Sequence, residues 1–198
     1  PKIYLYSYTN GLLVSETDAK GNVTSYAYNM LGQVVKKTDC CGNETNFEYG
    51  LAGNVTKVTY PDESFVSYVY DCNYRKISST DANGNVTEYS YNGNMKNTSV
   101  KLPDENVVSY EYDAEDRLIK EKDQLNNATT YTYDSAGRVI SKKLPDGAET
   151  TYEYDSVGNV LKETTVAGAK IIKTFDNNGN AVTVQVQDSD GNPYNDVI

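Results

Sequence analysis

Aromatic residues recur along the chain at a constant spacing. A Tyr-x-Tyr pair, in one case Phe-x-Tyr, returns every 21 residues from Tyr26 and Tyr28 to Tyr152 and Tyr154, and Phe175 continues the series alone. A glycine or a substitute for it follows four residues after the second tyrosine, and another turn position follows ten residues later. Two turn positions in each period leave room for two short strands.

The residues between these turn positions favour strands over helices. Tyr, Val, Ile and Thr dominate, and apolar and polar positions alternate, as in residues 130–133. We therefore predict an all-β fold in which tandem 21-residue β-hairpins form a single-layer, curled antiparallel sheet of about sixteen to eighteen strands. Residues 1–180 would form an array of about eight to nine repeats, and residues 181–198 a degenerate C-terminal repeat or tail.

The two turn positions predict two kinds of corner. Residues 134–137 (Asp-Ser-Ala-Gly) indicate a four-residue hairpin loop, because the aspartate can cap the turn and the glycine can adopt a positive φ. Residues 145–147 (Pro-Asp-Gly) indicate a three-residue loop, a type I turn followed by a left-handed residue. Asn126 suits that last position. Glu63 and Glu105 do not, so we expect their corners to bend differently.

These loops together predict a register. They place Tyr131 opposite Ile140 and Ile140 opposite Tyr152. The packed core would then be a row of Tyr131, Ile140, Tyr152 and Leu161, with Tyr133, Arg138, Tyr154 and Asn159 beside it. Each cross-strand pair contributes roughly 0.2–1 kcal/mol, so stability would accumulate in small increments along the array.

Composition restricts the chemistry that the chain can perform. Nineteen Tyr, three Phe and no Trp, with 38% apolar residues, suit a half-solvated sheet better than a thick core. The absence of histidine removes the commonest general base and metal ligand. The net charge of -10 disfavours binding to nucleic acid or anionic lipid, and no apolar stretch approaches the ~20 residues of a membrane span.

Acidic residues offer candidate sites, each with a structural alternative. The carboxylates of Glu149, Glu153 and Asp155 occupy solvent-facing strand positions and turn starts, with no apolar pocket to raise a pKa, so we predict no enzymatic activity. The corners at residues 18–22, 81–85 and 188–192 carry oxygen ligands that suit calcium, but they lack the spacing of an EF-hand. Side-chain capping explains the same residues, so we predict no metal or cofactor.

The three cysteines do not form a disulfide framework. Cys40 and Cys41 are adjacent in a corner of the Pro-Asp-Gly type, whereas Cys72 lies in a corner of the other type. The predicted hairpins place these corners on opposite edges of the sheet, roughly 23 Å apart, and a disulfide needs Cα atoms within about 7 Å. We therefore expect no intramolecular bond to Cys72.

Residues 131–139, followed by residues 144–147 and 151–155, resemble the YD repeat of Rhs-type proteins. The resemblance extends over essentially residues 6–180 and is strongest from 110 to 160. The family includes bacterial Rhs and wall-associated polymorphic toxins, the cocoon-forming components of insecticidal toxin complexes, and animal teneurins. Its structural repeat signature falls here on Tyr131, Tyr133, Asp134, Gly137, Arg138, Pro145, Asp146, Gly147, Tyr152, Tyr154, Asp155 and Gly158.

The resemblance implies a mechanical function. YD repeats in this family form a hollow β-shell that encloses a toxic C-terminal domain or supports adhesion. The chain would be a non-catalytic segment of a secreted or cell-surface shell, with flanking YD repeats and an encapsulated toxin or effector as partners. The alternative is an adhesion module whose tyrosine face binds carbohydrate or protein. The self-cleavage site of the family is typically marked by Asp-Pro, which this sequence lacks, so no protease residues are assigned.

Overall fold

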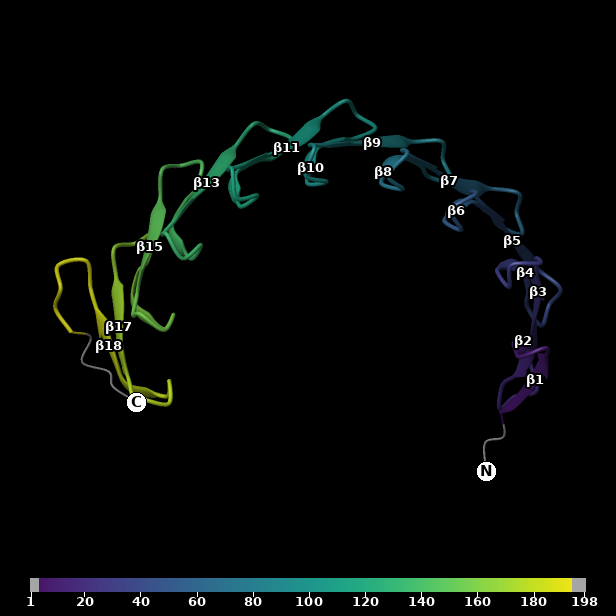
Figure 1. The fold of residues 1–198 in the computed structure, drawn as a ribbon, viewed down its shortest axis with the longest axis horizontal. Helices are drawn as coiled ribbons and strands as arrows, with labels where there is room; N and C mark the ends of the chain where they lie inside the picture. Colours follow the sequence, from purple (N-terminus) through teal and green to yellow (C-terminus); the bar gives the residue numbers. More distant parts are fainter. Residues whose placement is uncertain (1–3, 194–198) are drawn as a thin grey trace. The chain divides into compact units, whose positions relative to one another are not determined.

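The computed structural model describes residues 4–193, and these contain eighteen β-strands and no helix (Figure 1). The described residues therefore include no helix that could cross a membrane. The strands are β1 Leu5–Thr9, β2 Leu12–Thr17, β3 Val23–Tyr28, β4 Val34–Thr38, β5 Glu44–Tyr49, β6 Val55–Thr59, β7 Phe65–Tyr70, β8 Lys76–Thr80, β9 Val86–Tyr91, β10 Asn97–Lys101, β11 Val107–Tyr112, β12 Leu118–Lys122, β13 Ala128–Tyr133, β14 Val139–Lys143, β15 Glu149–Tyr154, β16 Val160–Thr164, β17 Lys170–Phe175 and β18 Ala181–Gln187.

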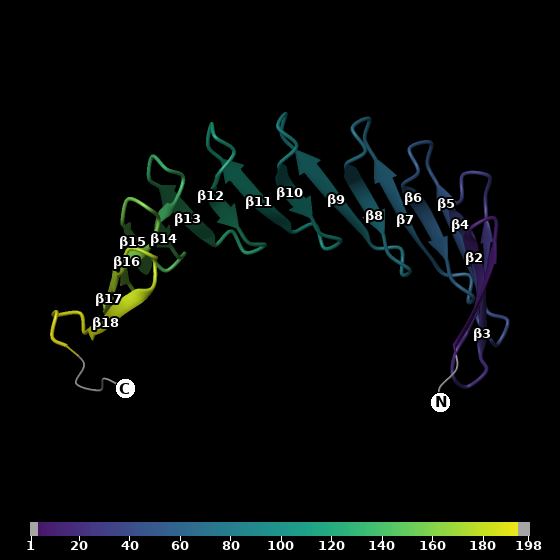
Figure 2. The same cartoon turned by 60° about the horizontal axis from the view of Figure 1, so that its bottom comes forward.

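The chain divides into two units, residues 1–90 with 101–105 and residues 91–100 with 106–198. In the first unit each strand from β1 to β8 pairs antiparallel with the next strand in the sequence. In the second unit the strands from β11 to β17 do the same (Figure 2). The all-β prediction with antiparallel hairpins is thus confirmed. Residues 181–187 form β18 on β17, and residues 194–198 lie outside the described residues.

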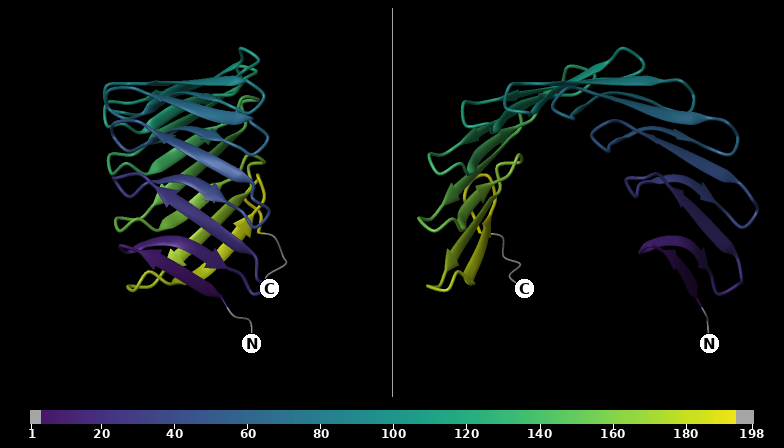
Figure 3. Two further views of the ribbon diagram at one scale, coloured as in Figure 1. Left: turned by 90° about the vertical axis from the view of Figure 1, so that its right-hand side faces the viewer. Right: turned by 45° about the vertical axis from the view of Figure 1, so that its right-hand side comes forward.

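Each unit is one layer of strands, with its turns along two opposite edges (Figure 3). No described residue is buried, so the sheet has no enclosed core. In β3 the exposed side chains of Val23, Ser25 and Ala27 alternate with half-buried ones, which include Tyr26 and Tyr28. The tyrosines therefore lie on the more covered face, as period-two alternation of side chains requires.

Both kinds of corner enclose three residues. In the 134–138 corner the Asp134 N–H donates to the Arg138 carbonyl and the Gly137 N–H donates to the Asp134 carbonyl, each at 3.0 Å. The predicted four-residue loop is therefore wrong, because Asp134 belongs to the closing pair of the hairpin rather than to its loop. The three-residue loop predicted at Pro145–Gly147 is confirmed, with Leu144 and Ala148 as the closing pair.

The predicted register is wrong in the hairpins that follow a tyrosine pair, such as β13–β14 and β15–β16. The register predicted for β14 and β15 from the closing pair of Leu144 and Ala148 is confirmed, because Ser141 lies opposite Thr151 and Lys142 opposite Thr150. Tyr131 lies opposite Lys142 rather than Ile140, and Tyr152 lies opposite Glu163 rather than Leu161. Two errors of one residue add up: the loop has three residues rather than four, and a β-bulge between Thr132 and Tyr133 adds one residue to β14. Ile140, predicted to lie in the core, is at the bulge and 37% exposed.

The corners that contain Glu63 and Glu105 were expected to bend differently, and this expectation is also wrong. Both glutamates adopt a left-handed backbone, with φ of 66° and 68°, close to the 64° of Asn126. The N–H of Glu63 donates to the Tyr60 carbonyl at 3.0 Å, as Gly147 does to Leu144. The strands on either side impose the turn, at a cost of roughly 1–2 kcal/mol for each residue with a Cβ atom.

The cysteines occupy opposite edges of the first unit, as predicted. Cys40 and Cys41 lie in the turn between β4 and β5, and Cys72 lies in the turn between β7 and β8. Three strands separate these turns, so the turns face opposite ways. All three thiols are free and exposed.

Candidate functional site

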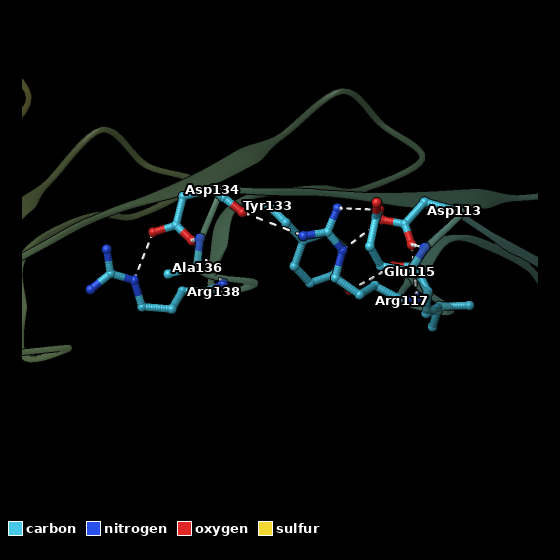
Figure 4. A network of polar contacts seen from close by, with 8 residues as sticks. Asp113, Glu115, Arg117, Tyr133, Asp134, Ala136 and Arg138 are labelled. Atoms are coloured by element: carbon cyan, nitrogen blue, oxygen red, sulfur yellow. Dashed lines mark hydrogen bonds and ion pairs between the residues drawn. The ribbon is translucent and has the colours of Figure 1, made fainter.

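The polar residues of the repeat signature hold the corners together. Asp134 Oδ1 accepts the N–H groups of Ala136 and Arg138, both at 2.9 Å, and Asp134 Oδ2 accepts Arg138 Nε at 2.6 Å (Figure 4). This aspartate thus binds two amides that the three-residue loop leaves without a backbone acceptor. The hydrogen bond from the Arg138 amide is the main reason that the pKa of Asp134 lies below its ordinary value.

Seven corners, drawn from both kinds, have asparagine where this one has arginine. At Asp155, Oδ1 accepts the amide of Asn159 at 2.8 Å and Oδ2 accepts its Nδ2 at 2.7 Å, and the Asn159 side chain lowers the pKa of Asp155. Gly158, the glycine of this corner, has a φ of 104°. The same aspartate and asparagine contacts occur in six further corners, at Asp18 and Asn22, Asp39 and Asn43, Asp81 and Asn85, Asp123 and Asn127, Asp176 and Asn180, and Asp188 and Asn192.

The second tyrosine of the pair connects neighbouring hairpins at six places along the chain. The Tyr154 hydroxyl donates to the Val139 carbonyl at 2.7 Å. Val139 is at the bulge, outside the pairs from Ser141 to Lys143 that join β14 to β15, so the phenol supplies a donor where the ladder does not reach. The same bond joins Tyr28 to Leu13, Tyr49 to Val34, Tyr70 to Val55, Tyr112 to Asn97 and Tyr133 to Leu118, always fifteen residues apart.

Two arginines add a second connection between hairpins. The Arg117 guanidinium lies 4.8 Å from the Tyr133 ring centre and donates to the Asp134 carbonyl at 3.4 Å (Figure 4). Arg138 repeats this arrangement one period later, 4.7 Å from the Tyr154 ring and 2.7 Å from the Asp155 carbonyl. Each arginine therefore binds the aspartate of its own corner and packs on the tyrosine that precedes the next corner.

The first tyrosine of the pair contacts polar partners rather than the predicted aliphatic row. The Tyr131 hydroxyl donates to Glu121 at 2.8 Å, and Lys142 lies 5.7 Å from its ring centre. Partial burial and the bond to Glu121 raise the pKa of Tyr131 to about 12. The ring of Tyr152 lies 6.5 Å from that of Tyr154.

The signature residues thus lie in successive corners and strands, and the structure does not gather them into one pocket. At the second corner, Asp146 Oδ1 accepts the Ala148 amide at 2.9 Å, Gly147 has a φ of 87°, and Pro145 is the first loop residue. Gly137 occupies the left-handed position of the first corner, with a φ of 80°. This arrangement holds the strands at a constant spacing and assembles no reactive groups within the described residues.

The carboxylates considered for catalysis have separate partners. Glu153 pairs with Lys162 at 2.7 Å, Glu149 accepts the Ser141 hydroxyl at 2.5 Å, and Asp155 caps its corner. The carboxylates considered for calcium bind the asparagines of their own turns, and the part of the chain that the structure describes contains no group of three or more metal-ligating residues.

The contact that sequence reasoning missed is the bond from tyrosine to the bulge carbonyl. A partial signal was present in the sequence, because an apolar residue precedes the second tyrosine by fifteen residues in five of the seven periods. In a regular ladder without the bulge, however, the carbonyl of that residue would bond to the neighbouring strand, so the fifteen-residue spacing alone did not predict a bond from tyrosine.

Comparison with known proteins agrees with this geometry. The family described as RHS Repeat matches residues 6–39, 28–64, 112–148 and 133–170, which together make up more than half of the chain. No curated protein matches the sequence.

Solved structures show the same fold at low sequence identity. A crystal structure of TcdB2-TccC3 without its hypervariable C-terminal region superposes with a TM-score of 0.58 and 15% identity, over 92% of this chain and 13% of that one. A Tc holotoxin pore of Photorhabdus luminescens with a mutation in TccC3 gives 0.51 and 14%, over 96% of this chain and 15% of that one. The chain thus spans only a small part of the proteins that it resembles.

Proposed function

Because the chain belongs to the RHS repeat family, we propose that it is a non-catalytic structural segment of a secreted or surface-exposed Rhs/YD-type shell. In this proposal flanking YD repeats continue the sheet, and the shell encloses a C-terminal toxin or effector. Residues 1–180 form the array, and residues 181–198 form a degenerate repeat or tail.

The observation that supports this function is the use made of the signature residues. Asp134 and Arg138 bind within their corner and to the next hairpin, and Tyr154 binds the preceding hairpin. Because the contacts of Arg138 and Tyr154 join one repeat to its neighbour, the array can be lengthened without a new kind of contact. Such a wall retains cargo by geometry and requires no reactive group.

The alternative, carbohydrate binding by the tyrosine face, has less support. Sugar recognition would use exposed rings and free hydroxyls, whereas the hydroxyls of Tyr49, Tyr133 and Tyr154, among others, donate to carbonyls within the sheet. Arginines also cover the rings of Tyr133 and Tyr154. We therefore propose no second function.

The test begins with the complete coding sequence, which should contain further repeats and a downstream effector-like domain. In the full-length protein a proline at Thr132, inside a paired strand, should open the wall and make the downstream domain sensitive to protease. Thr132→Val is the control and should leave the domain protected.

Two results would contradict the proposal. The domain could be equally accessible to protease in the parent protein and in Thr132→Pro, or one exposed carboxylate could prove essential. The second case is examined by substituting alanine for exposed residues such as Glu111 and Glu153. A variant that loses activity while it keeps its fold and its cargo would identify a chemical site.

A further inference from the structure

Cys40 and Cys41 form an exposed pair of thiols on a well-defined corner. Their sulfur atoms lie 3.8 Å apart. Other groups hold the corner: Asp39 Oδ1 accepts the amides of Cys41 and Asn43 at 2.8 and 2.9 Å, and Asp39 Oδ2 accepts Asn43 Nδ2 at 2.8 Å. The thiol side chains are therefore available for chemistry outside the turn.

An equivalent corner later in the same unit shows that the turn does not need the thiols. At residues 81–85, Ala82 and Asn83 replace the cysteines, and Asp81 accepts the same three hydrogen bonds at 2.9, 2.9 and 2.8 Å. The corner glycines, Gly42 and Gly84, have φ of 83° and 84°. The thiols are thus additional groups on a turn that forms in the same way without them.

The separation of the sulfurs lets both of them bond one soft atom. An atom at about 2.3 Å from each sulfur, a usual metal–thiolate length, would form an S–atom–S angle of roughly 110° with this pair. Zinc requires four ligands, but no group of three or more histidines, cysteines or acidic residues is assembled within residues 4–193. A trivalent organoarsenical needs only two protein thiols, because it brings its own third substituent.

We propose that the Cys40–Cys41 corner is a bidentate binding site for thiophilic trivalent arsenicals. An arsenical R–As=O reacts with the two thiols to form two As–S bonds, and the arsenic-bound oxygen leaves as water with both thiol protons. Arsenic stays trivalent, so no oxidant or reductant takes part.

Phenylarsine oxide is the probe for this site. The reduced chain should take up one phenylarsenic group, detected by intact-mass spectrometry, and a dithiol competitor should remove it where a monothiol does not. Cys40→Ser and Cys41→Ser should each lose the adduct, whereas Cys72→Ser, which removes the single thiol of the opposite edge, should keep it. Retention of the adduct by either of the first two variants, or its loss in the third, would overturn the assignment.

The two equivalent corners allow a test of preorganisation by the turn. The variant C40A/C41N/A82C/N83C exchanges the loop residues of the corners and should bind with unchanged affinity, because Asp81 and Asn85 form the same turn. Asn43→Ala removes one corner bond and should weaken binding in the parent chain. Equal binding by Asn43→Ala and by the urea-unfolded chain would show that adjacency in sequence suffices, which would refute the role of the turn.

Discussion

The bond from tyrosine to the bulge carbonyl makes a specific prediction about stability. Tyr133→Phe and Tyr154→Phe each remove one hydroxyl and leave the ring in place, so they delete the 2.7 Å bonds to Leu118 and Val139. The net contribution of one hydrogen bond to the free energy of unfolding is about 0.5–1.5 kcal/mol. Because these sites are only half-buried and water can reach the vacated carbonyl, we expect a loss of about 0.5–1 kcal/mol for each substitution.

The two losses should add. The tyrosines are two strands apart, a separation of roughly 9.6 Å at ~4.8 Å per strand, and effects at such distances usually add within ~0.3–0.5 kcal/mol. The double variant should therefore lose about 1–2 kcal/mol, read from urea unfolding followed by circular dichroism. An unchanged slope of free energy against urea would show that the variants alter stability and not the extent of unfolding.

Tyr152→Phe is the matched control, because Tyr152 lies in the same strand and on the same face. Within the described chain its hydroxyl makes no hydrogen bond, and its ring lies 6.5 Å from that of Tyr154. We expect this substitution to change the free energy of unfolding by less than ~0.5 kcal/mol. A loss at Tyr152 as large as that at Tyr154 would refute the importance of the carbonyl contact.

Three further predictions concern backbone strain and ionisation. Glu63→Gly should stabilise the chain by about 0.5–1 kcal/mol in urea unfolding, since glycine avoids the left-handed strain but loses more entropy on folding. The aspartates of the closing pairs, such as Asp18, Asp39 and Asp134, have lowered pKa values, at Asp18 mainly through the Asn22 side chain. Their contribution to stability is present above pH 3.8 and is lost as the pH falls through the lower folded value, so replacing these closing aspartates by asparagine should flatten acid unfolding. The bond to Glu16 raises the pKa of Tyr26 from 10.0 to about 12, so its contribution holds below pH 10 and is lost towards pH 12; Glu16→Gln should lower this pKa in an ultraviolet titration of tyrosinate.

The periodic features of the fold could be predicted from the sequence, because they depend on local residue chemistry. Strand type follows from alternating Tyr, Val and Thr, and the turn positions follow from residues that cap or adopt positive φ, such as Asp134, Gly137 and Gly147. The placement of Cys40 and Cys72 on opposite edges needed only the number of strands between them. None of these inferences depends on the exact register.

The register across the Pro-Asp-Gly corners could be predicted from their loop length, but the register of the hairpins that follow a tyrosine pair could not, because the bulge leaves little local trace. Val139 and Ile140 are ordinary strand residues, and nothing in their identity indicates that β14 contains one more residue than its partner needs. The capping role of Asp134 hid the error, since the motif reads as a four-residue loop when the aspartate is counted within it. The resulting error is two residues, so Tyr131 keeps its face of the sheet and lies opposite Lys142 instead of Ile140.

Phe175 allows the same bond to be tested by adding the hydroxyl instead of removing it. It occupies the second tyrosine position of its period, fifteen residues after Val160, whose carbonyl corresponds to that of Val139. The pairs between β16 and β17 begin at Lys162, as those between β14 and β15 begin at Ser141, so a phenol at 175 would meet the same geometry. Phe175→Tyr should therefore stabilise the chain by about 0.5–1 kcal/mol in urea unfolding.

Phe47→Tyr is the control for this gain, because it adds the same hydroxyl at a first tyrosine position. Tyrosines at that position reach the residue ten before them, which is Glu16 for Tyr26 but Lys37 for position 47. A lysine ammonium has no acceptor to offer the hydroxyl hydrogen, so the gain should be absent or smaller. If both substitutions stabilised the chain equally, the added ring hydroxyl itself would be the cause, and the bulge carbonyl would have no special role in joining one hairpin to the next.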